Sequence, residues 1–262
     1  MSAESLPISL RGVGVQYDMR LSRKRRLRGT LTGKYRSTEQ KKFWALRGID
    51  LEVKHGESLA VIGNNGAGKS TLLQTLAGII TPDEGSIEVR GRISTLLNLG
   101  AGFEDDLDAT ENILLAGEYL GIPHGTIRRK LHEIIEFADI GKFAHMPART
   151  YSSGMRARLG FSVATAVDPD VLLLDEVMAT GDAAFAEKSR GRVLELMGRA
   201  RAIVFVTHDL EAAEKFCTRA IEIEKGHIIS SGTPAEVIAA YRKRNSVTGP
   251  SSLGKRGVRA SF

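Results

Sequence analysis

Residues 63–71 combine glycines, a lysine and hydroxyl side chains in a spacing that is typical of a loop that binds phosphate groups. They read GNNGAGKST and fit the pattern G-x-x-x-x-G-K-[ST], with the apolar run SLAVIG before them and the helix-forming run KSTLLQTLAGI after them. Gly63, Gly66 and Gly68 allow backbone angles that turn successive N–H groups toward one anion, and the N-terminus of the following helix adds positive charge. The sequence therefore predicts a site for a nucleoside triphosphate.

The side chains of this phosphate loop have distinct expected roles. Lys69 would place its charge on the β- and γ-phosphates, Ser70 would offer its hydroxyl to Mg²⁺, and Thr71 would contact the adjacent phosphate. The remaining residues would surround the phosphates: Asn64, Asn65 and Ala67.

Two acids, Asp175 and Glu176, end the apolar run VLLLDE. Consecutive side chains of a strand point in different directions, so the two carboxylates can take different roles. We expect Asp175 to hold Mg²⁺, directly or through water, and Glu176 to polarise the attacking water as a general base. We also expect their strand to lie beside the strand that precedes the phosphate loop. Alone, such a pair could simply cap a strand, but the phosphate loop favours the catalytic interpretation.

His208 ends another apolar run, AIVFVTHD, and precedes Asp209. A lone histidine in this place is usually structural. Together with the phosphate loop and the two acids, it is interpreted as a contact to the γ-phosphate and the attacking water.

Short apolar runs alternate with longer helical ones, which favours an α/β fold. Three runs, at 58–63, 171–175 and 202–208, are nearly continuous in apolar residues, as central strands are. The runs near the two ends of the chain alternate instead, which predicts an antiparallel part with one exposed face. Residues 104–168 have helical spacing and predict a helical subdomain inserted between strands. The other expected strands are 8–17, 49–53, 86–91 and 220–226.

The net charge of +6 is unevenly distributed. Residues 20–42 carry ten Lys or Arg and one acid, and residues 242–262 carry six Lys or Arg and no acid. We expect a single domain over residues 1–240 that contains this basic insertion, followed by a disordered tail at 241–262. The basic segments have three possible interpretations: they are solvated, they contact an anionic membrane surface, or they contact nucleic acid. The sequence alone does not separate these interpretations.

Several classes of protein are disfavoured. The chain has no run of about 18 apolar residues, which disfavours a protein that spans a membrane by itself. No apolar core of a signal peptide is found near its start, which disfavours a secretory signal. Cys217 is the only cysteine, so an internal disulfide cannot form, and a reducing cytoplasm fits.

These motifs, in this order, resemble the nucleotide-binding subunit of an ABC transporter over about residues 6–240. The matching elements are GNNGAGKST, VLLLDE, the loop ATGD at 179–182 and VTHD, and the family's signature, usually LSGGQ, falls on YSSGM at 151–155. Together with FWALRGIDLEV, NLGAGF and DEVMATGDAAF, this signature is similar to the branch that exports bacterial polysaccharides such as O-antigen, capsule or teichoic acid.

The resemblance implies the α/β fold of an ABC-type P-loop NTPase, with a mixed central sheet and an antiparallel β part. It implies a homodimer in which two ATP molecules, with Mg²⁺, are each held by one chain's phosphate loop and the other chain's signature. Ser152, Ser153 and Gly154 would then contact the γ-phosphate in trans through backbone N–H groups and a helix dipole. Asp182 would cross the dimer interface.

Two positions of the family pattern have competing candidates here. The aromatic residue that stacks on adenine is Tyr17 or Trp44. The glutamine that usually follows the phosphate-loop region has no clear match, because LLNLGAGF occupies residues 96–103. Asn98 or Glu104 could replace it.

The resemblance further implies an ATPase on the cytoplasmic face of the bacterial inner membrane, docked on two polytopic permease subunits. ATP hydrolysis would power export of a polysaccharide or its lipid-linked form, and the loop at 96–103 with the following helices would touch the permease. No carbohydrate-binding domain and no nucleic-acid partner are expected. Two alternatives stay open: a lipid or small molecule as cargo, or an ATPase acting on nucleic acid or the ribosome, which the basic segments suggest.

Overall fold

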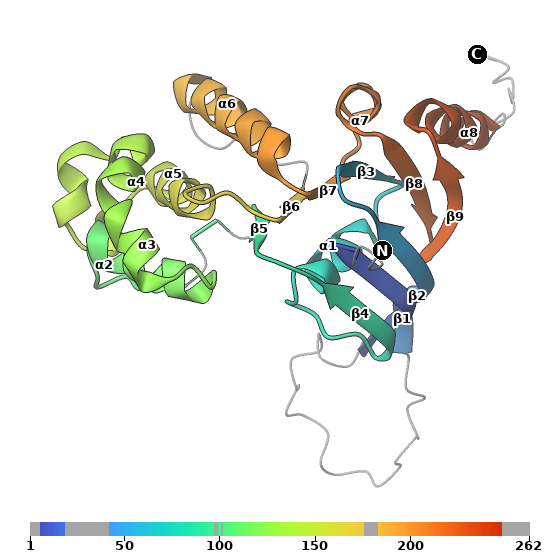
Figure 1. Cartoon of the computed structure of the whole chain (residues 1–262), viewed down its shortest axis with the longest axis horizontal. Coiled ribbons are helices and arrows are strands. Elements are labelled where there is room, and N and C mark those ends of the chain that lie inside the picture. The colour runs from blue at the N-terminus through green and yellow to red at the C-terminus, as the bar shows by residue number, and fades with distance from the viewer. Residues whose placement is uncertain (1–5, 19–41, 97–98, 101, 176–182, 248–262) are drawn as a thin grey trace, which may run out of the picture.

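The computed structural model describes residues 6–18, 42–96, 99–100, 102–175 and 183–247, which form two sheets and a set of surrounding helices (Figure 1). The basic insertion and residues 248–262 lie almost entirely outside these residues.

The larger sheet has six strands in the order β5-β6-β7-β3-β8-β9. The first five are parallel and β9 pairs antiparallel with β8. The strands are β3 (Glu57–Ile62), β5 (Ile93–Thr95), β6 (Val171–Leu174), β7 (Ala202–Val206), β8 (Arg219–Glu224) and β9 (His227–Gly232). The three runs richest in apolar residues, β3, β6 and β7, are neighbours in its interior, and every described residue of β6 and β7 is buried.

One expectation about this sheet is wrong. The strand that precedes Asp175, β6, does not lie beside the phosphate-loop strand β3, because β7 lies between them. The chain leaves β6, passes through α6 (Ala183–Arg199) and returns as β7 into the position next to β3. Strand β7, which leads to His208, therefore separates Asp175 from the phosphate-loop strand.

The smaller sheet is antiparallel, in the order β2-β1-β4. Its strands are β1 (Ile8–Asp18), β2 (Lys42–Val53) and β4 (Glu84–Val89). Strand β2 begins seven residues before the expected start at residue 49. Asp18 and Lys42 are opposite each other at one end of the β1–β2 pair, so the chain leaves and re-enters this sheet at adjacent points.

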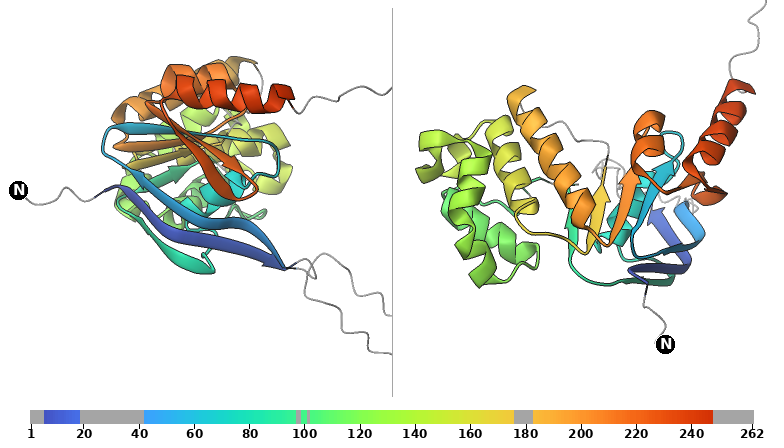
Figure 2. Two further views of the ribbon diagram at one scale, coloured as in Figure 1. Left: turned by 90° about the vertical axis from the view of Figure 1, so that its right-hand side faces the viewer. Right: turned by 45° about the horizontal axis from the view of Figure 1, so that its top comes forward.

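Helix α1 (Lys69–Leu76) packs between the two sheets (Figure 1). Leu72, Leu73 and Leu76 are buried with residues from both sheets in one hydrophobic cluster. On the other face of the larger sheet, α6, α7 (Leu210–Phe216) and α8 (Pro234–Val247) contribute to a second cluster (Figure 2). Both faces of β3 are thus covered, which fixes the phosphate loop that follows it.

A separate group of helices lies to one side of the sheets (Figure 1). It consists of α2 (Ala109–Tyr119), α3 (His124–Arg129), α4 (Leu131–Ala138), α5 (Ser153–Ala164) and two short 3₁₀ helices, η1 (Gly141–His145) and η2 (Ala148–Thr150). These helices have their own hydrophobic cluster. Asp108 and Glu111 form a capping box that starts α2, since each side chain accepts a hydrogen bond from the other residue's backbone N–H.

The expectation of a disordered tail from residue 241 is wrong for residues 241–247. Helix α8 continues to Val247, because Tyr241 packs against the second hydrophobic cluster and Arg244 pairs with the buried Glu222. No helix among the described residues is long and apolar enough to cross a membrane.

Candidate nucleotide site

The phosphate loop is held tightly between two strands. Gly63, Gly66 and Gly68 have φ values of 150°, 77° and 113°, which favour glycine. A Cβ on Gly63 would lie 2.2 Å from the carbonyl oxygen of Ile223 in β8, and one on Gly68 would lie 2.6 Å from that of Ala45 in β2. Any side chain at these two positions would push the loop out of place.

Hydrogen bonds fix the loop in its curved form. The N–H of Ala67 donates to the carbonyl of Asn64 at 3.1 Å, and the N–H of Gly226 donates to the carbonyl of Ala67 at 2.8 Å. The Lys69 Nζ donates to the carbonyls of Gly63 and Asn64, at 2.6 Å and 3.1 Å. The ammonium group therefore rests on the loop, within its concave turn.

A cavity of about 430 Å³ opens at this loop. It brings the loop together with the ends of β1 and β2, and so places Tyr17 beside the phosphate-loop residues. Its lining consists of Tyr17, Phe43, Ala45, Asn65, Gly66, Gly68, Lys69, Ser70 and Thr71.

The cavity has a second aromatic residue that sequence reasoning missed, Phe43. Tyr17 and Phe43 are 43% and 52% exposed, unusually high for aromatic side chains. Trp44 does not line the cavity: its ring lies 2.9 Å from the Cβ position of Gly14 and 5.3 Å below the Arg47 guanidinium. Because successive strand residues alternate between faces, the sequence signal was present: if Trp44 faces one side, Phe43 faces the other.

Asp175 and His208 follow β6 and β7 at the same edge of the sheet as the phosphate loop. Parallel strands β3, β7 and β6 end there together, with Leu174 opposite Phe205 and Phe205 opposite Ala60. Two strand spacings, about 10 Å, therefore separate the chain at Asp175 from β3. Asp175 is half-buried and His208 is exposed. This edge therefore carries a carboxylate and an imidazole that could contact a ligand bound at the phosphate loop.

Ser70, which carries a hydroxyl, lines the cavity, and Asp175, which carries a carboxylate, follows β6 at the same sheet edge. Both groups are hard oxygen donors, which Mg²⁺ prefers, and Mg²⁺ commonly takes one or two protein ligands together with phosphate oxygens and waters. These residues fit a Mg²⁺ ion that accompanies a nucleotide.

The signature segment lies in the helical group, outside the phosphate-loop cavity. Ser152 is the N-cap of α5, and its hydroxyl oxygen accepts a 3.2 Å hydrogen bond from the N–H of Met155. Ser152 and Ser153 are exposed, and Gly154 is half-buried. An exposed helix N-terminus is a ready anion-binding site for a second molecule.

Tyr151, the first signature residue, points inward instead and packs against the cluster of the helical group. Burial, followed by the negative charge of Asp108, raises the pKa of the Tyr151 phenol. Its buried hydroxyl has no hydrogen-bond partner within the described part of the chain. This residue anchors the segment, while the two serines are exposed.

Three of the predicted site residues lie outside the described residues: Glu176, Asp182 and Asn98. Glu104, the other candidate for the missing glutamine, is described. Its backbone N–H and carbonyl both bond to the side chain of Asn112, and it does not line the phosphate-loop cavity.

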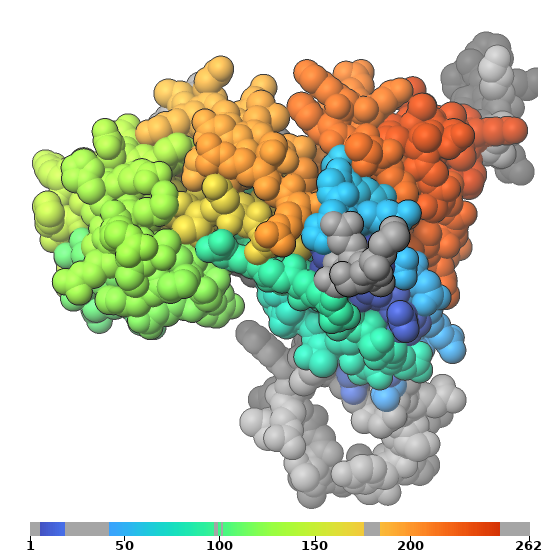
Figure 3. All heavy atoms as spheres, in the orientation of Figure 1, coloured from blue at the N-terminus to red at the C-terminus, as the bar shows by residue number. Residues whose placement is uncertain are grey.

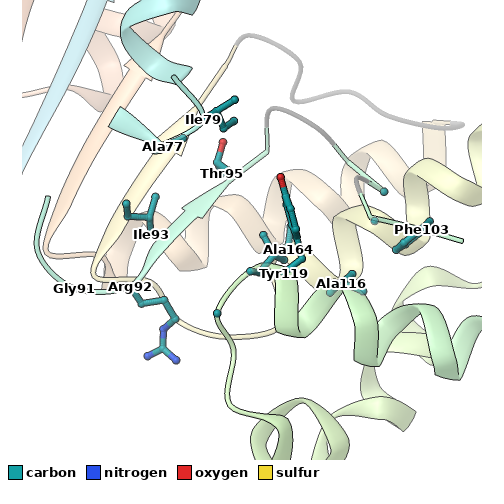
Figure 4. Close-up of a pocket in the computed structure, with 16 residues that line it drawn as sticks. Ala77, Ile79, Gly91, Arg92, Ile93, Thr95, Phe103, Ala116, Tyr119 and Ala164 are labelled. Carbon is teal, nitrogen blue, oxygen red and sulfur yellow. The ribbon is translucent and has the colours of Figure 1, made fainter. Parts of the chain in front are cut away.

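A larger cavity, of about 580 Å³, lies between the sheets and the helical group (Figure 4). The end of α1, strand β5 and helices α2 and α5 surround it, with Tyr119 and Phe103 contributing aromatic rings. In Figure 3 the helical group abuts the remainder of the molecule, with a notch in the lower outline between the helical group and the sheets.

The fold and this set of motifs define a class of protein. A family model described as "ABC transporter" matches residues 46–179, and the chain belongs to that family of ATP-binding cassettes.

Relatives at about 40% identity include ATP-binding proteins of export systems. The O-antigen export system ATP-binding protein RfbB of Myxococcus xanthus is 42% identical over 91% of this chain and 57% of its own length. The protein of the same name from Klebsiella pneumoniae is 40% identical over 78% of this chain and 82% of its own. The teichoic acids export ATP-binding protein TagH of Lactococcus lactis is 39% identical over 79% of this chain, which spans 44% of that relative.

Solved structures share the fold. A dimeric ATP-binding cassette in a post-hydrolysis state, bound to ADP and phosphate, superposes with a TM-score of 0.63 at 22% identity, over 87% of this chain and 98% of that one. An ATP-binding subunit of an ABC transporter gives a TM-score of 0.66 at 20% identity, over 94% and 96%. The predicted cassette fold, with its mixed sheet and antiparallel part, is thereby confirmed.

Proposed function

We propose that this chain is the ATP-hydrolysing subunit of an ABC exporter for a bacterial polysaccharide such as O-antigen or teichoic acid. The observation that carries the ATPase assignment is the cavity that joins the phosphate loop, with Lys69, Ser70 and Thr71, to the paired rings of Tyr17 and Phe43. The glycines and Asn64, Asn65 and Ala67 would surround the phosphates, and an aromatic ring would cover the base.

Each residue has a role that follows from its place. Ser70 and Asp175 would hold Mg²⁺, which, when bound, neutralises charge on the phosphate oxygens. Glu176 would act as general base toward water, and His208, which follows the strand between β6 and β3, would contact the γ-phosphate. Lys69 would leave the loop carbonyls and pair with the phosphates.

The signature supports a homodimer. Ser152, Ser153 and Gly154 lie at the exposed N-terminus of α5 and do not line the chain's own phosphate-loop cavity, so a second copy would receive them. We propose that they contact the γ-phosphate bound to the partner subunit and that Asp182 lies at this interface. The dimeric form of the similar cassette supports this arrangement.

We propose that the permease subunits dock at the larger cavity, on the cytoplasmic face of the inner membrane. This cavity joins the two parts of the fold: its lining includes Gly100 and Phe103 from the loop that replaces the usual glutamine, and Gly160 from the signature helix. A permease segment that moves within it would contact the helix that begins at the signature. The export of O-antigen and teichoic acids by relatives supports a polysaccharide cargo.

The ATPase assignment is tested with the purified chain and Mg-ATP. Glu176→Gln should keep ATP binding, form a stable dimer in size-exclusion chromatography and lose hydrolysis by about 10²-fold or more. Lys69→Ala should lose nucleotide affinity. Near-normal hydrolysis by the Glu176→Gln variant would contradict the role of Glu176, and unchanged ATP binding by the Lys69→Ala variant would contradict the phosphate loop.

The cargo is tested in the bacterium that carries the chain. Deletion of its gene should leave the polysaccharide inside the cell and remove it from the surface, and the wild-type gene, but not the Glu176→Gln gene, should restore it. Unchanged surface polysaccharide would contradict this cargo. Salt-sensitive binding of RNA by the purified chain, without recovery of a membrane protein, would instead favour a nucleic-acid ATPase.

A further inference from the structure

The C-terminal helix α8 makes side-chain contacts with the phosphate loop at Asn64. The Tyr241 hydroxyl donates a 2.9 Å hydrogen bond to Asn64 Oδ1, and Asn64 Nδ2 donates a 3.3 Å hydrogen bond to Asn245 Oδ1. Both ends of the Asn64 amide are therefore held by one helix that lies 177 residues away in the sequence.

This part of α8 is fixed in place by its own contacts. Arg244 forms an ion pair with Glu222, which is only 4% exposed, and α8 packs against β8 and β9 (Figure 2). Glu222 is opposite Ile62, the residue before the phosphate loop, in the pairing of β8 and β3. Within the helix, Asn245 Nδ2 also donates to the Tyr241 carbonyl at 3.1 Å. The helix is therefore anchored at the point where the loop begins.

Asn64 connects these contacts with the loop's interior. While its side chain faces α8, its backbone carbonyl accepts hydrogen bonds from Lys69 Nζ and from the N–H of Ala67, both at 3.1 Å. The orientation of the Asn64 peptide thus affects the curvature of the loop. It also affects the position of the Lys69 ammonium group, which would bind the phosphates.

We propose that Tyr241 and Asn245 are positioning residues for nucleotide binding, which hold the phosphate loop in its binding form through the side chain of Asn64. This proposal rests on the proposed ATPase function. A loop that is already curved loses less conformational entropy when it closes around phosphates, so the two contacts raise affinity without touching the nucleotide. Helix α8 is then a part of the nucleotide site, although none of its residues lines the cavity.

The test uses the full chain and titration calorimetry with Mg-ATP. Tyr241→Phe removes only the hydroxyl and keeps the ring that packs on the core, and Asn245→Ala removes the other contact. Each variant should bind about threefold to tenfold more weakly, the range expected for one neutral hydrogen bond. The matched control is Ser246→Ala, because Ser246 is exposed and its hydroxyl, within the described residues, donates to the Lys243 carbonyl of its own helix turn. It should bind as the wild type does.

A double-mutant comparison separates positioning from general stability. In an Asn64→Ala background, Tyr241→Phe should cause no further loss of affinity, because the partner of the hydroxyl is already absent. A full additional loss there would overturn the proposal, since the hydroxyl would then act by another route. A fall in melting temperature without a change in affinity would overturn it too.

The outcomes also distinguish this proposal from the function on which it rests. If the wild type binds Mg-ATP and both α8 variants match it, the positioning role is wrong and the ATPase assignment stands. If the wild type, shown to be folded by its melting transition, binds no nucleotide, both are wrong.

Discussion

Tyr17 and Phe43 are directly opposite each other in the pairing of β1 and β2, and both line the phosphate-loop cavity. Side chains at opposed positions of an antiparallel pair lie on the same face of the sheet. The pair thus forms an aromatic surface next to the phosphate loop, while Trp44 lies on the other face.

The aromatic pair should bind the base and not the phosphates. Tyr17→Ala and Phe43→Ala should each weaken ATP binding by about fivefold to a hundredfold, since stacking of one base on an aromatic ring contributes about 1–3 kcal/mol. Neither change should alter the affinity for inorganic tripolyphosphate with Mg²⁺, which has no base. Calorimetry with both ligands checks this, with Tyr17→Phe as the control that keeps the ring. An equal loss for tripolyphosphate would show that the rings act on the loop.

Gly160 lets the signature helix contact the backbone of the loop at 99–100. A Cβ on Gly160 would lie 2.2 Å from the N atom of Gly100, so Gly160→Ala should lower the free energy of unfolding by about 1–3 kcal/mol. Gly191→Ala is the matched control, because Gly191 lies in α6 with no described atom from outside its own helix turn within 4 Å of its Cβ position, and alanine should stabilise this helix by about 0.5–1 kcal/mol. Urea unfolding should give opposite signs, and a stabilising Gly160→Ala would contradict the close contact.

Asn112 should be essential for the segment 104–108. This residue is fully buried; its side chain accepts a hydrogen bond from the Glu104 N–H and donates to the carbonyls of Glu104, Leu107 and Asp108. Asn112→Ala leaves these backbone groups without their partner and should cost about 1–3 kcal/mol of stability or more. Thermal unfolding checks this against Glu118→Ala, an exposed change on the same helix. Equal melting temperatures would show that water replaces the side chain.

Cys217 should be inert in the folded chain. Burial raises the pKa of its thiol from 9.0 to about 12, so a thiol reagent at pH 8 should label it only when urea unfolds the protein. Because the folded pKa lies above the unfolded one, the thiol's contribution to stability is complete below about pH 9 and is lost as the pH rises toward 12. The free energy of unfolding should therefore fall more steeply above pH 9 in the wild type than in Cys217→Ala. Parallel pH profiles, or rapid labelling without urea, would contradict this.

The parts of the site that depend on adjacent residues could be predicted from the sequence. Gly63, Gly66 and Gly68 determine the form of the loop locally, and the helix after Lys69 follows the motif directly. The central positions of β3, β6 and β7 could also be predicted, because continuous apolar runs indicate strands that are covered on both faces.

The parts of the fold and of the site that depend on long-range pairing could not be predicted from the sequence. The position of β7 between β6 and β3 is a matter of strand order, which no local pattern contains. Alternation along β2 could place Phe43 and Trp44 on opposite faces, but it could not show that Phe43 is opposite Tyr17, because that depends on the register of β1 and β2. The contacts of Tyr241 and Asn245 with Asn64 join positions about 180 residues apart, and a Ser-, Gly- and Arg-rich end of the chain gave no sign of them.

Because Asp18 and Lys42 are opposite each other, the connection between β1 and β2 can vary in length and charge. A two-residue hairpin turn could join such opposed strand ends without any change in the pairing of β1 with β2. The segment 19–41 carries nine Lys or Arg against one Glu. Replacement of this segment by such a turn would therefore change the chain's net charge from +6 to −2. The isoelectric point of the protein can therefore move across neutrality through this one connection, while the sheet that carries Tyr17 and Phe43 keeps its register.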